Sequence, residues 1–270
     1  MKHAHRLGFS SLILALLVSA ECRPAMADEV ILRAAGSLKA ALTEVTQAFE
    51  KQSGHAVRLD FGPSGLLRER ILSGEPTDVF ASANMAHPED IAVQRGGKVL
   101  PFATNMLCAL VQPDIAVTPN TLLEQMLSAD IRLGTSTPQA DPSGDYAWML
   151  FDKSDSLKPG AAAALKDKAL TLTGGANSPK PPADRTVYSL VMERRDADIF
   201  LTYCTNAVLA AQEVPGLRIV QIPDALSVGA TYGLLVLKER QPAIDLGNFI
   251  TGSEGQAILA AYGFGMPPAK

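Results

Sequence analysis

The sequence holds few of the side chains on which hydrolytic and redox enzymes rely. Its 270 residues include four histidines, three cysteines and one tryptophan. His3 and His5 lie in an N-terminal segment that we expect to be removed, which leaves His55 and His87. His55 follows a glycine at an apparent turn and His87 precedes a proline. We therefore interpret both as loop residues without a catalytic role.

Several catalytic and cofactor motifs are also absent from the sequence. It contains no G-x-S-x-G nucleophile elbow, no Cys/His spacing typical of zinc, and no Walker or dinucleotide-binding glycine pattern. A Ser-His-Asp hydrolase would have to place one of the two remaining histidines beside a nucleophile. These absences disfavour enzyme chemistry but do not exclude it. We predict that the protein is not an enzyme and that it has no catalytic residues and no cofactor.

The first residues have the three parts of a secretory signal peptide. Lys2 and Arg6 give a positive start, Leu7–Ala20 is apolar, and a small-x-small pattern ends at Ala27. The apolar run is shorter than the ~20 residues that span a bilayer, and no later segment is long and apolar enough. We predict a signal peptide at residues 1–27 and an exported mature protein.

A lipid anchor on Cys22 is the alternative fate of this segment. Glu21 stands directly before that cysteine, where a small residue is expected, so we prefer cleavage after Ala27.

The mature chain is mildly acidic. The signal peptide takes away three basic residues and one acidic residue, so 24 basic and 28 acidic residues become 21 and 27, a net charge of −6. There is no basic run and no aromatic RNA-binding motif, so nucleic acid is not an expected partner. An anionic ligand would have to be bound by local donors, because the overall field does not attract anions.

The mature chain keeps two cysteines, Cys108 and Cys204. Each lies at the end or the beginning of an expected strand, and we prefer to interpret them as buried free thiols. A Cys108–Cys204 disulfide is the alternative, because the compartment permits it but the sequence does not give the Cα separation.

Strands and helices are expected to alternate along the chain. This pattern predicts an α/β fold with a parallel sheet, in one large sheet or two smaller lobes. No internal repeat or low-complexity tract interrupts it. Strands are expected at residues 30–37, 56–61, 77–83, 106–113, 131–137, 197–203, 217–222 and 230–237, with helices between most of them and two more at the C-terminus.

Four of the strand-to-helix corners carry residues suited to an anion site. Ser37, Ser64 and Ser143 each stand where a helix begins, and Arg185 opens a fourth helix. A helix N-terminus has unsatisfied N–H groups and partial positive charge, and in open α/β sheets ligands bind beyond the carboxyl ends of strands. Each serine taken alone is also a common helix cap without a ligand.

At these corners the sequence resembles the periplasmic molybdate-binding proteins of ABC import systems. The resemblance runs from about Val30 to Phe264. It rests on several motifs in the right order: "AAGSL", "FGPSGLLRERILSGEPTDVFASAN", "DPSGDYA", "LVMERRDADIFLTYCTNAV" and "YGFGMP".

The resemblance implies a two-lobed periplasmic binding protein fold of type II, in which each lobe is a mostly parallel sheet flanked by helices. By analogy the first lobe comprises residues 28–107 and 230–270, and the second comprises residues 108–229. The lobes are expected to close on a tetrahedral oxyanion.

The resemblance also implies the ligand contacts. They fall on Ser37 and Ser64 in the first lobe, and on Ser143, Arg185 and Tyr203 in the second. The serines would donate hydroxyl and backbone N–H groups and Tyr203 its phenol, while Ser143 and Arg185 would contribute mainly backbone N–H. No residue is expected to touch the metal of the oxyanion directly.

Three positions depart from the family pattern. Ser143 and Arg185 stand where small or apolar residues are common, and Asn206 stands where aspartate is frequent, a change that we do not interpret. The Arg185 side chain points either to solvent, with Asp184 nearby as cap or partner, or into the cleft, where it would bind an anion bidentately.

The implied function is capture of molybdate, and potentially tungstate, for the membrane permease of an ABC transporter, by a monomeric protein. One alternative keeps the fold but exchanges the ligand for another oxyanion or a small organic acid bound through Arg185. A second alternative is an exported enzyme that uses the same cleft.

Overall fold

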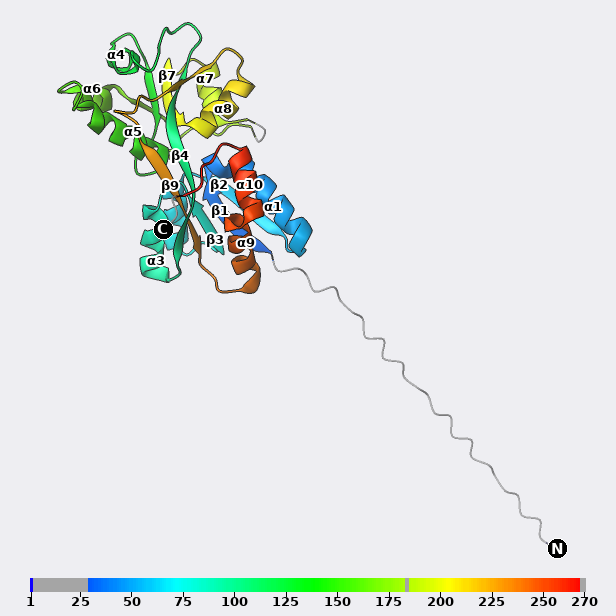
Figure 1. Cartoon of the computed structure of the whole chain (residues 1–270). Helices are drawn as coiled ribbons and strands as arrows, with labels where there is room; N and C mark the ends of the chain where they lie inside the picture. Colours follow the sequence, from blue (N-terminus) through cyan, green and yellow to red (C-terminus); the bar gives the residue numbers. More distant parts are fainter. Residues whose placement is uncertain (2–28, 183–184, 268–270) are drawn as a thin grey trace.

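The computed structural model describes residues 1, 29–182 and 185–267. The predicted signal peptide, apart from Met1, lies outside the described residues, and so does its predicted cleavage site. The described chain forms two lobes, one above the other in Figure 1.

The first lobe contains the N-terminal and C-terminal parts of the described chain. It is built from β1 (Val30–Ala35), the 3₁₀ turn η1 (Gly36–Leu38), α1 (Lys39–Ser53), β2 (Val57–Gly62), α2 (Ser64–Leu72), β3 (Val79–Ser82), α3 (Ala86–Arg95), β9 (Gly229–Val236), α9 (Gln241–Thr251) and α10 (Ser253–Ala261).

The middle of the chain forms the second lobe, which β4 (Val99–Val111) enters from the first. It is built from α4 (Leu122–Leu127), β5 (Leu133–Ser136), α5 (Pro142–Ser154), α6 (Ala161–Lys168), β6 (Leu170–Thr173), α7 (Val187–Glu193), β7 (Ile199–Tyr203), α8 (Cys204–Glu213) and β8 (Arg218–Gln221).

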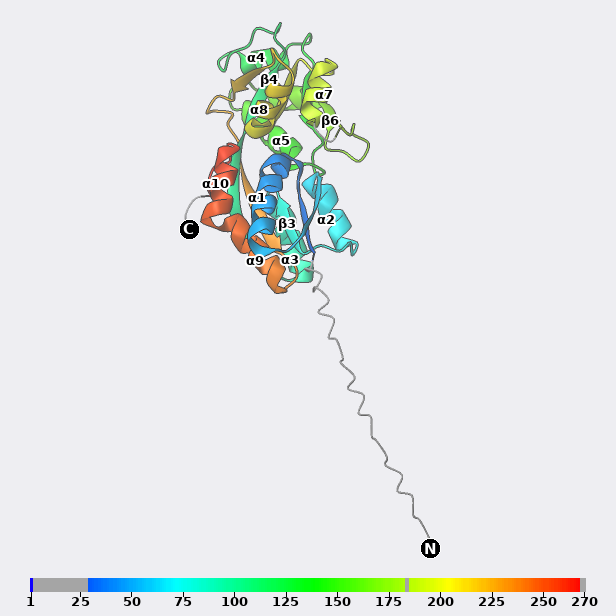
Figure 2. The same cartoon turned by 90° about the vertical axis from the view of Figure 1, so that its right-hand side faces the viewer.

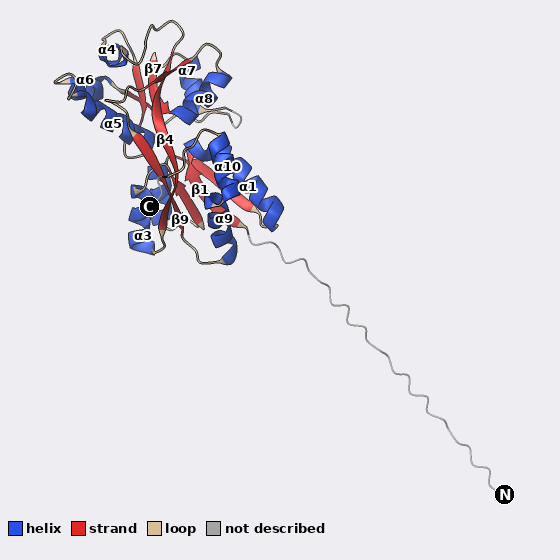
Figure 3. Ribbon diagram, in the orientation of Figure 1, coloured by secondary structure: helices blue, strands red, loops and turns tan. Residues whose placement is uncertain are grey.

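The strands follow one hydrogen-bonded path, β2-β1-β3-β9-β4-β7-β5-β6, with β8 also paired to β4. The outer pairs are parallel: β1 with β2 and β3, and β5 with β6 and β7. β4 and β9, which join the lobes, pair antiparallel with their neighbours. Helices flank the strands of both lobes (Figure 3). The predicted fold class is confirmed.

Side chains at alternate strand positions pack on opposite faces of the first lobe's sheet. Val79 and Ala81 of β3 pack into the core that includes residues of α1, α9 and α10, while Phe80 packs with residues of α2 and α3. Figure 2 shows these two groups of helices on different sides of the strands. Because both faces are covered, the strands are apolar at successive positions, as is typical of parallel sheets.

β4 changes partners halfway along its length. Its residues 99–106 pair with β9, and residues 107–111 pair with β7 and β8. The change falls between Met106 and Leu107, next to the lobe boundary that the resemblance places after residue 107. The boundaries themselves stay a prediction, because a change of strand partner does not by itself define a domain.

The sequence misplaced the start of one strand. β4 begins at Val99, although we expected a strand only from residue 106, because Pro101 and Asn105 obscure the apolar pattern. α2 begins at Ser64, the corner where a helix was expected to begin, and Pro63 directly precedes it. In the part of the chain that the structure describes, no helix has the length and apolar character needed to cross a bilayer.

Cys108 and Cys204 are bonded to each other, so the preferred interpretation as free thiols is wrong. Cys108 lies on β4 and Cys204 is the first residue of α8, with a Cα separation of 4.8 Å. The pairing of Leu107 with Tyr203 in the neighbouring strands brings them together. Sequence alone could not show this, because 96 residues separate them.

We expect loss of this disulfide to lower the free energy of unfolding by about 2–5 kcal/mol, because the crosslink restricts a long loop in the unfolded chain. The double variant Cys108→Ala/Cys204→Ala and the reduced wild-type protein should unfold at similar, lower denaturant concentrations than the oxidised protein. Reductant should leave the double variant unchanged. Equal midpoints for oxidised and reduced wild type would contradict the prediction.

Candidate functional site

Four of the five predicted ligand residues lie at the carboxyl ends of parallel strands. Ser37 is in η1 after β1, Ser64 opens α2 after β2, Ser143 is the second residue of α5 after β5, and Tyr203 ends β7. In open α/β sheets this edge forms the ligand crevice. The two lobes therefore present these four hydroxyl groups from comparable places in their sheets.

Ser37 contacts a tyrosine that the sequence analysis missed. Its Oγ lies 3.0 Å from the phenol oxygen of Tyr232 on β9, and the same phenol accepts a hydrogen bond from Asn105 Nδ2 at 3.4 Å. Tyr232 is fully buried, and burial raises the pKa of its phenol, so it remains a neutral hydrogen-bonding group. A tyrosine in an apolar strand gives no sequence signal of this contact.

Ser64 and Tyr203 meet at the peptide groups of Ala83, which follows β3. The Ala83 N–H donates to Ser64 Oγ at 3.1 Å, and the Tyr203 phenol donates to the Ala83 carbonyl at 3.4 Å. Ser64 therefore does not cap its own helix, and accepting this bond leaves its hydroxyl hydrogen available to donate. Ala83 belongs to the first lobe and Tyr203 to the second, so the contact crosses between the lobes.

Tyr203 is held among other aromatic rings. Its ring centroid lies 5.6 Å from that of Tyr232 and 6.2 Å from that of Tyr146. It is 1% exposed, and burial raises the pKa of its phenol well above the usual value, with neighbouring phenols adding to the effect. The phenol is therefore a hydrogen-bond donor throughout the physiological pH range.

A backbone contact at the start of α2 joins the two lobes directly. The N–H of Gly65 donates to the carbonyl of Ala140 at 2.8 Å. A Cβ at position 65 would lie 2.1 Å from the Gln139 oxygen and 2.8 Å from the Ala140 oxygen, so a side chain does not fit here. The glycine after Ser64 thus allows the second lobe to approach the helix end closely.

Ser143 follows this contact on the second lobe. Asp141 caps α5, and its Oδ1 accepts the N–H of Ser143 at 3.1 Å. The Ser143 side chain is fully buried, and its Oγ has no hydrogen-bond partner among the described residues. A buried hydroxyl without a partner costs free energy, so this group is suited to a ligand that supplies one.

Asp141 brings a negative charge to the site, which the sequence analysis did not consider. The residue is half-buried and its carboxyl group lies deep among protein atoms, and this burial raises its pKa to about 6. The hydroxyls of Ser136 and Thr173, at the ends of β5 and β6, lie 2.8 Å from each other, and the Ser136 side chain acts against the rise in the Asp141 pKa. In the sequence, an aspartate before a proline indicates an ordinary helix cap, so the burial of its carboxyl group could not be predicted.

The Arg185 side chain forms ion pairs with two glutamates of the second lobe. Its Nη1 lies 2.7 Å from a carboxylate oxygen of Glu193 on α7, and its Nε lies 3.5 Å from one of Glu213 on α8. Its backbone N–H donates to the Pro182 carbonyl. None of its described contacts is with Ser37, Ser64, Ser143 or Tyr203, and its expected neighbour Asp184 lies outside the described residues. Its role as a ligand contact stays a prediction.

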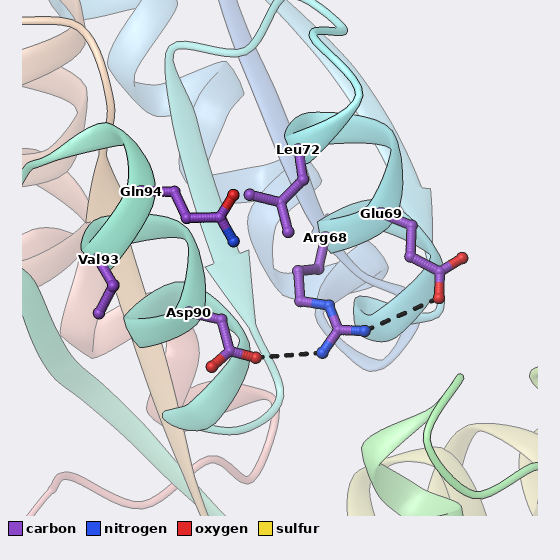
Figure 4. A pocket seen from close by; sticks show the side chains of 6 residues that line it. All are labelled: Arg68, Glu69, Leu72, Asp90, Val93 and Gln94. Carbon is purple, nitrogen blue, oxygen red and sulfur yellow. Dashed lines mark hydrogen bonds and ion pairs between the residues drawn. The ribbon is translucent and has the colours of Figure 1, made fainter.

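A surface pocket on the first lobe does not include the candidate site. It lies between α2 and α3, where Arg68 forms ion pairs with Asp90 and Glu69 (Figure 4).

Arg68 Nη1 also lies 3.5 Å from Nδ1 of His87. His87 is buried in the first turn of α3 and is not the loop residue we expected. Burial first, and then the charge of Arg68, lower its pKa to about 4, so the ring is neutral at pH 7.

The two lobes, with hydroxyl groups gathered between them at the ends of parallel strands, define a type II periplasmic binding protein fold. Solved structures agree. The periplasmic molybdate-binding protein of Azotobacter vinelandii matches with a TM-score of 0.68 at 21% identity, over 88% of this chain and 100% of that chain. The sulfate-binding protein SubI of Mycobacterium tuberculosis matches with a TM-score of 0.70 at 17% identity, over 87% and 86%.

Sequence similarity shows the family to which the chain belongs. The model for the family described as bacterial extracellular solute-binding protein matches residues 30–265, and the chain belongs to that family. An uncharacterized protein of Pasteurella multocida is 37% identical over 74% of this chain and 84% of its own length. The molybdate-binding protein ModA of Escherichia coli is 26% identical over 89% and 91%. The resemblance to molybdate-binding proteins is therefore confirmed.

We expect Gly65→Ala to force the lobes apart and to destabilise the protein by about 1–3 kcal/mol, because the new methyl group overlaps the backbone at Gln139 and Ala140. Small-angle X-ray scattering of the ligand-free protein should show a larger radius of gyration. Gly62→Ala is the matched control from the same corner, since its Cβ would meet only the Leu67 side chain at 3.6 Å. Identical scattering from the wild type and both variants would refute the expectation.

Proposed function

We propose that this protein is an exported solute-binding protein that captures molybdate, with tungstate as a second ligand, between its two lobes and delivers it to the permease of an ABC importer. The observation that supports the proposal is the pair of lobe-to-lobe contacts at Ala83 and Ala140, which involve Ser64, Tyr203 and the neighbours of Ser64 and Ser143. Ser37, Ser64, Ser143 and Tyr203 all lie at the carboxyl ends of strands. The ModA relatives support the choice of ligand.

The chemistry of the site suits a small tetrahedral oxyanion. Hydroxyl and backbone N–H donors bonded to a charged acceptor form stronger bonds than neutral pairs do, so a few preorganised donors can replace the hydration of the ion. No residue needs to contact the metal inside the oxyanion. Closure of the lobes would bury the ion, and the permease would recognise the closed form. The protein acts without catalysis and as a monomer, in the periplasm, after cleavage at Ala27.

Another oxyanion is the second candidate ligand, and the likeness to a sulfate-binding protein favours it. Such an oxyanion, or a small organic acid, was expected to bind through an Arg185 side chain that enters the cleft. Two glutamates now neutralise that side chain, which weakens the Arg185 route but leaves sulfate binding through hydroxyl and N–H donors open. The remaining alternative is an exported enzyme that uses the same cleft, and only measured turnover of a substrate would support it.

A thermal-shift panel tests the choice of ligand. Molybdate and tungstate should raise the unfolding temperature strongly, because a ligand at about 100 times its Kd stabilises the native state by about 2.7 kcal/mol. Sulfate, phosphate and small carboxylates should have little effect. Stabilisation by sulfate, phosphate or a carboxylate, with molybdate inert, would overturn the proposed ligand.

Ser64→Ala tests the hydroxyl of the first lobe. We expect it to weaken molybdate binding by about 1–3 kcal/mol in calorimetric titrations, because a buried donor to the ion is lost. Ser73→Ala, just after the other end of α2, is the matched control, since its exposed hydroxyl donates only to the Arg70 carbonyl. Equal affinity of the Ser64 variant and the wild type would leave Ser64 with a purely structural role at Ala83.

A further inference from the structure

The carboxyl group of Asp141 lies beside the backbone N–H of Ser143 in the candidate site, and the proposed function gives it no task. Its Oδ1 accepts the N–H of Ser143 at 3.1 Å. The residue before it, Ala140, accepts the N–H of Gly65 from the first lobe. The carboxyl group therefore sits next to the contact between the lobes, at the start of the helix that carries the unpartnered hydroxyl of Ser143.

The end of β6 leaves room for this carboxyl group. A Cβ on Gly174 would lie 2.6 Å from Asp141 Oδ2, and the φ of +76° at Gly174 also favours glycine. The Ser136 hydroxyl acts on the carboxylate, whose pKa it lowers, and its Oγ lies 2.8 Å from Thr173 Oγ1. The carboxyl group thus lies among backbone and hydroxyl groups at the ends of two neighbouring strands of the second lobe, β5 and β6.

No cation appears among the described groups that act on this carboxyl. Burial is the main cause that raises its pKa to about 6, and the charge of Asp145 on the same helix adds to the rise. The neighbouring phenols of Tyr188 on α7, Tyr203 on β7 and Tyr232 on β9 are neutral, because burial raises the pKa of each. At neutral pH an unpaired negative charge therefore lies close to the donors for the anion.

Helix capping explains only part of this arrangement. A cap requires the bond from Ser143 N–H to an oxygen of the side chain, and asparagine serves equally well in that role. It does not require enclosure of a charge. A buried carboxylate next to a bound dianion is disfavoured, since like charges in a low-dielectric site repel strongly.

We propose that Asp141 is a specificity-determining residue that makes the site bind an oxyanion together with one hydrogen, located between the Asp141 carboxyl group and a ligand oxygen. A protonated anion brings this hydrogen itself. For a fully ionised anion, Asp141 takes one proton from solvent and donates its O–H to the ligand. The inference rests on the proposed function, because it assumes that the anion lies against Ser143.

Calorimetric titration with molybdate at several pH values tests the inference. Molybdate is fully ionised at neutral pH, so its affinity should fall about tenfold for each pH unit above the Asp141 pKa of about 6. Titrations in buffers of different ionisation enthalpy should show uptake of about one proton per molybdate. Asp141→Asn keeps the cap, removes the charge and supplies an N–H donor. It should bind molybdate with little pH dependence, and at alkaline pH more tightly than the wild type.

Asp145→Asn is the matched control. It removes a second carboxylate from the first turn of α5, where Oδ1 of Asp145 accepts the Gln139 N–H at 2.7 Å. This variant should keep the fall of affinity with pH and the proton uptake, but the fall should begin at a somewhat lower pH, because the charge of Asp145 contributes to the raised Asp141 pKa. A pH dependence that disappears in the Asp145 variant and persists in the Asp141 variant would overturn the assignment.

The outcomes separate this inference from the proposed function. Failure of molybdate, tungstate, sulfate and phosphate to bind at every pH would contradict the proposed oxyanion site itself. Molybdate binding without proton uptake, with an affinity that neither pH nor Asp141→Asn changes, would contradict only the role of Asp141. Circular dichroism and thermal unfolding of each variant without ligand establish that the comparison is made between folded proteins.

Discussion

The hydrogen bond from the Gly65 N–H to the Ala140 carbonyl is the contact on which the geometry of the candidate site depends. It brings the start of α2 on the first lobe against the segment that leads into α5 on the second. Ser64 directly precedes Gly65, and Asp141 and Ser143 follow Ala140, so this one approach places the polar groups of both lobes together. It requires glycine, because a methyl group would overlap the opposite backbone.

A second contact across the lobes uses side chains. The Ala83 backbone receives the Tyr203 phenol at its carbonyl and offers its N–H to Ser64. The disulfide at Cys204 and the pairing of Leu107 with Tyr203 fix the end of β7, so the phenol has little freedom to move away. The position of a hydroxyl group in the site thus depends on packing and a crosslink that lie outside it.

The sequence was sufficient for the order of strands and helices, because apolar periodicity, glycine stops and proline starts are local signals. It also placed Ser37, Ser64, Ser143 and Tyr203 at strand ends, a position that follows from the alternating pattern and the resemblance together. What it could not provide were pairings over long separations. The bond between Cys108 and Cys204, the contact of Ser37 with Tyr232 and the enclosure of Asp141 by Gly174 and Ser136 all depend on segments that only the folded chain brings together.

Without a ligand, the site donors are only partly satisfied by one another, and this bears on how an anion can bind. The Tyr203 phenol donates its hydrogen to the Ala83 carbonyl over a long distance of 3.4 Å, and the Ser143 hydroxyl has no partner among the described residues. Binding is favoured when a long neutral hydrogen bond is replaced by a shorter charge-assisted one. It is also favoured when the unpartnered Ser143 hydroxyl gains an acceptor, because its burial without a partner costs free energy. While it is charged, the Asp141 carboxylate repels an anion and so offsets the free energy gained from both changes. The net affinity for an oxyanion is therefore set by the balance between hydroxyl donors that lack a good partner and one acid whose charge must be neutralised.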